Sequence, residues 1–180
     1  MANQTNPVVP EQEQEQDRNV LRQIRLEKLR QRQKDGNDPF TITKYDVTAK
    51  AASIKSSYEE TEARFMEEAA GDEEALQAKL DTLKEQPISI AGRIMSWRDM
   101  GRANFIDVRD DTDRIQVYIR SNDVGKEFFK QDFKKWDIGD IVGVKGFVFR
   151  TKKGEISIHA QEIPLLSKSL LPLPEKWHGL

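Results

Sequence analysis

Residues 102–119 read RANFIDVRDDTDRIQVYI, and this stretch decides the fold. Apolar side chains occupy every second position on each side of a polar turn at residues 110–113. A period of two is typical of strands that turn one face to a protein core, so the stretch predicts a β-hairpin. The side chains expected to fill the core are Ile106, Val108, Ile115, Val117 and Ile119.

The opposite face of this hairpin carries a large ring where polar side chains are expected. Phe105 shares that face with Asp107, Arg109, Gln116, Tyr118 and Arg120. An outward phenylalanine is either covered by another segment, such as the N-terminal helices, or available to a ligand. Gln116 is likewise either a polar side chain that simply faces solvent or a group that pairs with a base edge.

The hairpin belongs to a longer series of predicted strands. Strand patterns occupy residues 88–97, 104–110, 114–120, 140–151 and 155–163, and a helical pattern occupies residues 123–136. Three strands, one helix and two strands follow the order of a five-stranded OB-fold, an all-β Greek-key barrel. The glycines at positions 92, 143 and 146 fit strands that bend sharply. A β-sandwich is the alternative, but the single helix between strands three and four favours the barrel.

An OB-fold barrel suggests a ligand for the outward ring of Phe105, because oligonucleotides commonly bind across strands two and three of this fold. We expect Phe105 and Tyr118 to stack on bases, and Gln116 to offer both a donor and an acceptor to a base edge. Arg93 and Arg98 lie in and just after predicted strand one, and their side chains could reach phosphates or the plane of a base. Glu155 opens strand five, where it could accept a hydrogen bond from a base.

Residues 1–87 show helical and low-complexity sequence patterns in place of the strand patterns of the predicted barrel. Residues 1–16 are rich in Gln, Glu and Pro and are expected to be disordered. Residues 17–35 predict a basic helix from a cap at Asp17 to a stop at Gly36, which either contacts a phosphate backbone or forms a solvated face. Residues 55–86 predict an acidic helical segment broken near Gly71. Together, residues 17–87 form the expected helical N-terminal extension.

The composition excludes several kinds of site. The 180 residues include no cysteine and two histidines, which excludes disulfides and thiolate metal sites and disfavours a histidine-rich metal site. No apolar run approaches the ~20 residues of a membrane-spanning helix, and the N-terminus lacks the features of a secretory signal. Residues 88–166 carry 14 basic and 12 acidic side chains, so nucleic-acid binding would depend on local groups rather than a broad positive field. There is no GxxxxGK phosphate loop.

Residues 88–180 resemble the anticodon-binding region of class II, bacterial-type lysyl-tRNA synthetases. The matching segments are AGRIMSWRDMGRANFIDVRD, RIQVYIR, FKKWDIGDIVGVKGFVFRTKKGEISIHAQEI and LLSKSLLPLPEKWHGL. The segment RLEKLRQRQKDGNDPF resembles the N-terminal helix of the same family, whereas residues 55–86 match it least and resemble a variable insertion.

The resemblance implies particular roles for the residues named above. The family stacks an aromatic ring of strand two on the middle anticodon base, a uracil, which matches Phe105. It pairs that base with a glutamine of strand three and an arginine near the end of strand one, which match Gln116 and Arg98, with Arg93 as the alternative. Glu155 matches a glutamate that reads a neighbouring base. Further RNA contacts are possible at Tyr118, Arg109, Arg102, Arg25 and Arg32.

The resemblance also implies a larger enzyme. These synthetases attach lysine to tRNA(Lys) through a lysyl-adenylate, with ATP and Mg²⁺ bound by a catalytic domain that follows the barrel, and they act as cytoplasmic homodimers. We expect this chain to bind neither cofactor, to be inactive alone, and to have neither DNA nor a membrane as a partner. Residues 167–180 resemble the linker into the catalytic domain, so we expect a fragment of the enzyme. The alternatives are a free-standing OB-fold that binds single-stranded nucleic acid and a protein-interaction OB domain.

Overall fold

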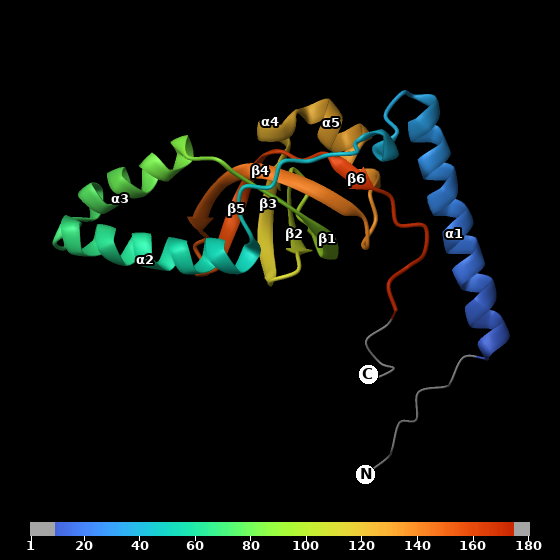
Figure 1. Cartoon of the computed structure of the whole chain (residues 1–180), viewed down its shortest axis with the longest axis horizontal. Helices are drawn as coiled ribbons and strands as arrows, with labels where there is room; N and C mark the ends of the chain where they lie inside the picture. Colours follow the sequence, from blue (N-terminus) through green and yellow to red (C-terminus); the bar gives the residue numbers. More distant parts are fainter. Residues whose placement is uncertain (1–9, 175–180) are drawn as a thin grey trace, which may run out of the picture.

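The computed structural model describes residues 10–174, and its centre is a closed five-stranded barrel (Figure 1). The strands are β1 (Ile88–Asp99), β2 (Ala103–Arg109), β3 (Arg114–Arg120), β4 (Ile141–Arg150) and β5 (Ile156–Glu162). Their order is β1-β2-β3-β5-β4, and the pairing of β4 with β1 closes the barrel. The expected OB-fold is confirmed, and a short strand β6 (Leu165–Ser167) extends it beside β4.

The alternating residues of the central hairpin fill the barrel as predicted. Ile106, Val108, Ile115, Val117 and Ile119 are each at most 1% exposed. Burying side chains of this size contributes about 1.5–3 kcal/mol each, so the hairpin is a main source of the barrel's stability. The barrel glycines have a steric reason: a Cβ on Gly92 would lie 2.5 Å from the carbonyl oxygen of Arg109 on β2.

The segment between β3 and β4 closes one end of the barrel, although it is not the single helix expected over residues 123–136. It divides into α4 (Ser121–Val124), α5 (Lys126–Gln131) and the 3₁₀ turn η3 (Phe133–Lys135). Gly125, with a φ of 97°, ends the first helix because other residues rarely adopt this conformation. Phe129, Phe133 and Trp136 are buried, and Phe133 stacks on Trp97 of β1 at 4.6 Å.

Helix α1 (Glu11–Lys34) is longer than the sequence suggested. The expectation of disorder over residues 1–16 is wrong for residues 11–16, which are helical, and residues 1–9 lie outside the described residues. Gln and Glu are good helix formers, and Glu11 and Glu13 favour the positive end of the helix dipole, so the helix begins six residues before Asp17.

Two further helices form a hairpin on the other side of the barrel from α1 (Figure 1). They are α2 (Ala51–Ala69) and α3 (Glu73–Asp81), followed by the 3₁₀ turn η2 (Thr82–Glu85); another, η1 (Pro39–Thr41), lies between α1 and α2. The predicted break near Gly71 is confirmed, with φ values of 49° at Ala70 and 87° at Gly71. The helical region begins at Ala51, before the expected residue 55.

The turn between β2 and β3 anchors the start of α2. Asp110 accepts a hydrogen bond from the amide of Ala51 at 2.7 Å, while Lys50 pairs with Asp111 and Lys55 with Asp113. Burial alone would raise the pKa of Asp110. Hydrogen bonds from the Thr112 hydroxyl and from neighbouring amides, including that of Ala51, outweigh it and lower the pKa to about 2.

Ion pairs and hydrogen bonds join helix α1 to the segment that follows β6. Lys168 is 5% exposed and pairs with Asp137 at 2.6 Å and with Asp140 at 2.9 Å, and Lys28 of α1 pairs with the same Asp137 at 2.7 Å. Arg25 of α1 donates to the carbonyl oxygen of Leu171 at 3.0 Å. Residues 167–171, expected to be linker, therefore pack against the barrel and α1, while residues 175–180 lie outside the described part of the chain.

Candidate nucleic-acid interface

Four aromatic side chains stand in one row across the outer face of the barrel. Strand register places Phe105 of β2 opposite Tyr118 of β3, Tyr118 beside His159 of β5, and His159 opposite Phe147 of β4. Successive ring centroids lie 5.0, 5.1 and 4.7 Å apart. These spacings are those of interacting aromatic rings, so the row is a continuous aromatic surface.

Phe105 faces outward and is half-buried, as the alternation of β2 requires. Its ring contacts among the described residues are with Tyr118 and Arg98, and neither comes from a helix. The alternative that the N-terminal helices cover this ring therefore finds no support among those contacts. The guanidinium carbon of Arg98 lies 4.8 Å from the ring centroid, within the range of a cation–π interaction.

The two arginines of β1 have different positions. Arg98 is opposite Phe105 in the strand register, whereas Arg93 is opposite Arg109, at the far end of the hairpin. Nη1 of Arg93 donates to the carbonyl oxygen of Gly139 at 2.7 Å. Geometry therefore brings Arg98, and not Arg93, next to the candidate stacking ring.

Gln116 lies between the aromatic row and the turn that anchors α2. Its Oε1 accepts a hydrogen bond from the hydroxyl of Ser157 at 2.9 Å, which fixes the amide orientation. Within residues 10–174, no partner occupies its NH₂ group, so two N–H donors remain available. Asp107, opposite Gln116 on β2, is already bound by the hydroxyl of Ser96 at 2.7 Å.

Glu155 stands just before β5, at the same end of the sheet as Arg114. Its backbone is bonded to Thr151 across the turn, and the side chain is exposed with no ion-pair partner in the described part of the chain. The carboxylate is two residues from Ser157, which touches Gln116. Glu155 therefore lies two residues before the hydrogen-bond partner of Gln116 on β5.

The other predicted RNA contacts divide into two groups. Arg102 and Arg109 are exposed, and within residues 10–174 neither side chain has a hydrogen-bond or ion-pair partner. Arg25 and Arg32 point into the protein instead: Arg25 donates to Ser169 and Leu171 after β6, and Arg32 pairs with Asp132 before η3. Both are thus engaged inside the protein, as a long basic side chain can be when its helix packs on a folded domain.

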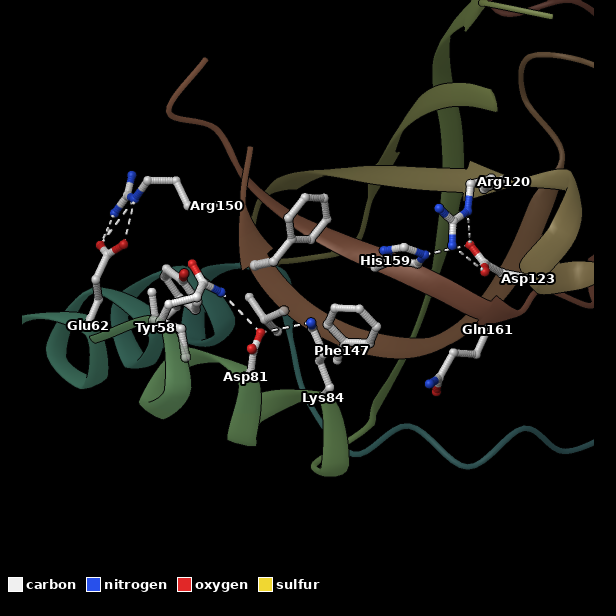
Figure 2. Close-up of a pocket in the computed structure, with 14 residues that line it drawn as sticks. Tyr58, Glu62, Asp81, Lys84, Arg120, Asp123, Phe147, Arg150, His159 and Gln161 are labelled. Atoms are coloured by element: carbon white, nitrogen blue, oxygen red, sulfur yellow. Dashed lines mark hydrogen bonds and ion pairs between the residues drawn. The ribbon is translucent and has the colours of Figure 1, made fainter. Parts of the chain in front are cut away.

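A groove of about 740 Å³ separates the barrel from the α2–α3 hairpin, next to the aromatic row. Figure 2 shows Phe147 and His159 on the barrel side and Tyr58 and Lys84 on the helical side. The charged side chains that line the groove form ion pairs with one another: Arg150–Glu62, Lys84–Asp81 and Arg120–Asp123. Asp123 is also hydrogen-bonded to His159 at 2.6 Å. The groove is consequently aromatic and nearly neutral.

Phe147, Phe149 and His159 also lie on this face, and none of the three was predicted as a site residue. The signal was present in FVFRT and SIHAQ, where alternation puts these rings on the outer phase, but the strand partners could not be known. No group of three metal-ligating side chains occurs in residues 10–174. Among the same residues, no helix has the length and apolarity to cross a membrane.

Comparison with known proteins agrees with this geometry. Residues 88–166 match the tRNA anticodon family, described as an OB-fold nucleic acid binding domain. The chain is 42% identical to a lysine–tRNA ligase of Clostridium tetani over 166 residues, which are 92% of this chain and 28% of that protein. It is 41% identical to a lysine–tRNA ligase of Clostridium novyi over 162 residues, 90% of this chain and 27% of the relative.

The chain thus spans little more than a quarter of the length of the curated relatives it matches. Fold, outer-face chemistry and sequence identity point the same way. Residues 88–166 are an OB-fold domain of the tRNA anticodon family, and the chain is homologous to the N-terminal part of lysine–tRNA ligases.

Proposed function

We propose that this barrel recognises the central uracil of the lysine tRNA anticodon, as the tRNA-binding part of a lysine–tRNA ligase. The observation that carries the proposal is the grouping of Phe105, Arg98 and Gln116 on one open face. The aromatic ring supplies a stacking platform, the arginine a nearby cation, and the glutamine free donors. Each is a group that single-stranded RNA recognition uses.

Stacking would hold the base without selecting it. The face of Phe105 accepts any nucleobase, and stacking of this kind is worth roughly 1–3 kcal/mol per base. Arg98 rests on the ring in the free protein, and on RNA binding it would move to the plane or edge of the bound base. Tyr118 contacts Phe105 from the neighbouring strand, with ring centroids 5.0 Å apart, and helps to hold the platform in place.

Selection of uracil falls to Gln116. Because Ser157 holds Oε1, the NH₂ group is the part of the amide that faces a ligand. A uracil presents carbonyl acceptors to that donor, whereas a cytosine would bring its own amino group to the place of the O4 carbonyl. Two donors cannot pair, and leaving one of them buried without an acceptor costs about 1–3 kcal/mol. Glu155, on the same edge, would accept from the neighbouring anticodon base.

The activity of the larger protein is part of the proposal. The relatives are ligases, so we infer that the whole enzyme activates lysine with ATP and Mg²⁺ in a class II catalytic domain, as a cytoplasmic homodimer. The described residues contribute tRNA binding and no chemistry of adenylation. The purified chain should accordingly show no lysine-dependent ATP–pyrophosphate exchange. Measurable exchange would refute the assignment of adenylation to a separate catalytic domain.

Binding of two RNA stem–loops that differ in a single base tests the recognition. The chain should bind a lysine anticodon stem–loop more tightly than the same stem–loop with a central cytosine, by about 5- to 150-fold if one donor is lost. Gln116→Ala should remove most of that preference while leaving the chain folded, because the side chain is half-buried on the outer face. Equal binding of the two RNAs by the unmodified chain would contradict specific recognition and favour a non-selective single-strand binder.

A further inference from the structure

Three arginines form a row across the outer face of the barrel, at the end of the sheet away from Phe105. Strand register places Arg93 of β1 opposite Arg109 of β2, and Arg109 opposite Arg114 of β3. Arg93 and Arg109 are exposed, and the side chain of Arg114 is 39% exposed. We call these three residues the arginine row.

Like charges placed directly across neighbouring strands destabilise a sheet, so the row needs an explanation. Within residues 10–174, Arg109 has no partner, and Arg93 is bonded only to the neutral carbonyl of Gly139. Arg114 has a carboxylate neighbour, Asp107, at the long distance of 3.5 Å. The protein therefore leaves most of the row's positive charge uncompensated.

Carboxylates are present next to the row, but they are committed elsewhere. Asp110, Asp111 and Asp113 follow Arg109 in the turn, and each points to α2: Asp110 to the amide of Ala51, the other two to lysines at positions 50 and 55. Each of these carboxylates therefore already has a partner outside the row. The start of α2 thus keeps the row free for an external anion.

We propose that the arginine row binds the RNA phosphate of a nucleotide that flanks the central anticodon base. Arg109 is four residues from Phe105 on β2, about 13 Å along the strand, which is too far for the phosphate of the stacked nucleotide and suits one beside or beyond it. Guanidinium groups bind phosphate oxygens bidentately. The groove beside α2 and α3 is charge-paired, so it offers no comparable phosphate site.

This inference rests on the proposed function. The variant Arg109→Gln tests phosphate binding by the arginine row separately from recognition of the central uracil. The variant should fold, since it removes only repulsion, and its binding to the lysine stem–loop should lose about 0.7 from the slope of log affinity against log salt concentration. Between 50 and 200 mM salt, that change reduces the loss of affinity by roughly 2.5-fold. The uracil-over-cytosine preference should be unchanged, because phosphate contacts carry no base information.

The matched control is Lys145→Gln, which removes an exposed cation from β4, away from the row. It should leave the salt slope within error of the unmodified chain. An unchanged slope in Arg109→Gln, or an equal change in both variants, would overturn the arginine row as a phosphate site while leaving uracil recognition intact. Failure of the unmodified chain to prefer uracil would instead contradict the proposed function.

Stem–loops with single neutral methylphosphonate linkages locate the contact. In the unmodified chain, neutralising one phosphate within two nucleotides of the central uracil should weaken binding. In Arg109→Gln the same substitution should have a smaller effect, since the central guanidinium of the row is gone and only Arg93 and Arg114 remain. Equal sensitivity of the two proteins at every flanking phosphate would refute the assignment.

Discussion

Replacing Phe105 by alanine tests the stacking platform most directly. The substitution removes a ring available to a base, and stacking on such a ring contributes roughly 1–3 kcal/mol. The free protein already gains about 0.5–1 kcal/mol from the cation–π contact with Arg98, which is given up when the base binds. The net loss on Phe105→Ala should therefore be about 0.5–2 kcal/mol, or roughly a 2- to 30-fold weaker complex.

The assay is a titration of fluorescent lysine anticodon stem–loop at fixed salt, with unfolding temperatures measured alongside. Phe105→Leu keeps apolar volume against Tyr118 but loses the aromatic face, so it should bind like the alanine variant. Phe105→Tyr keeps the face and should bind within about twofold of the unmodified chain. A folded Phe105→Ala variant that binds with unchanged affinity would refute stacking on this ring, and leucine matching tyrosine would point to simple apolar contact.

Two further predictions concern stability. Lys168→Met should cost about 3–5 kcal/mol by calorimetry, because it leaves the buried carboxylate of Asp140 without its cation; a loss below 1 kcal/mol, or one equal to that of the exposed control Lys145→Met, would contradict this. Asp110 has a folded-state pKa of about 2, below its ordinary 3.8, so its contribution to stability is present above about pH 4 and is lost as the pH falls toward 2. Urea unfolding between pH 5 and pH 2 should show a shallower pH dependence in Asp110→Asn, and parallel curves would exclude the carboxylate as the cause.

The sequence predicted the barrel well because its signals are local. Alternation in residues 102–119 depends only on which face of a strand is buried, and Ile106 and Val117 are buried as that rule requires. The start of α1 does not follow from composition alone, because Gln-rich and Glu-rich segments occur in disordered chains and also favour helices. The broken helix before β4 escaped prediction since its apolar spacing continues across Gly125.

The candidate site was predicted only in part for a different reason. Phe105 and Gln116 lie on adjacent strands of one hairpin, so their neighbourhood follows from local pairing. The contributions of His159 and Ser157 depend on β3 pairing with β5 in parallel, which no short-range pattern specifies. The separation of Arg93 from Arg98 likewise required the register of β1, including its irregularity between Ile94 and Ser96.

The parallel pairing of β3 with β5 affects the order in which the parts of the candidate base-binding site form during folding. Ser157 orients Gln116 from 41 residues further along the chain, and β4 and β5 must both be made before the barrel closes on β1. Contacts this distant in sequence form late, because the loop entropy must be overcome first. During synthesis β2 and β3 can pair before β5 is made, whereas the base selectivity proposed for Gln116 requires β5 to have emerged and docked against β3.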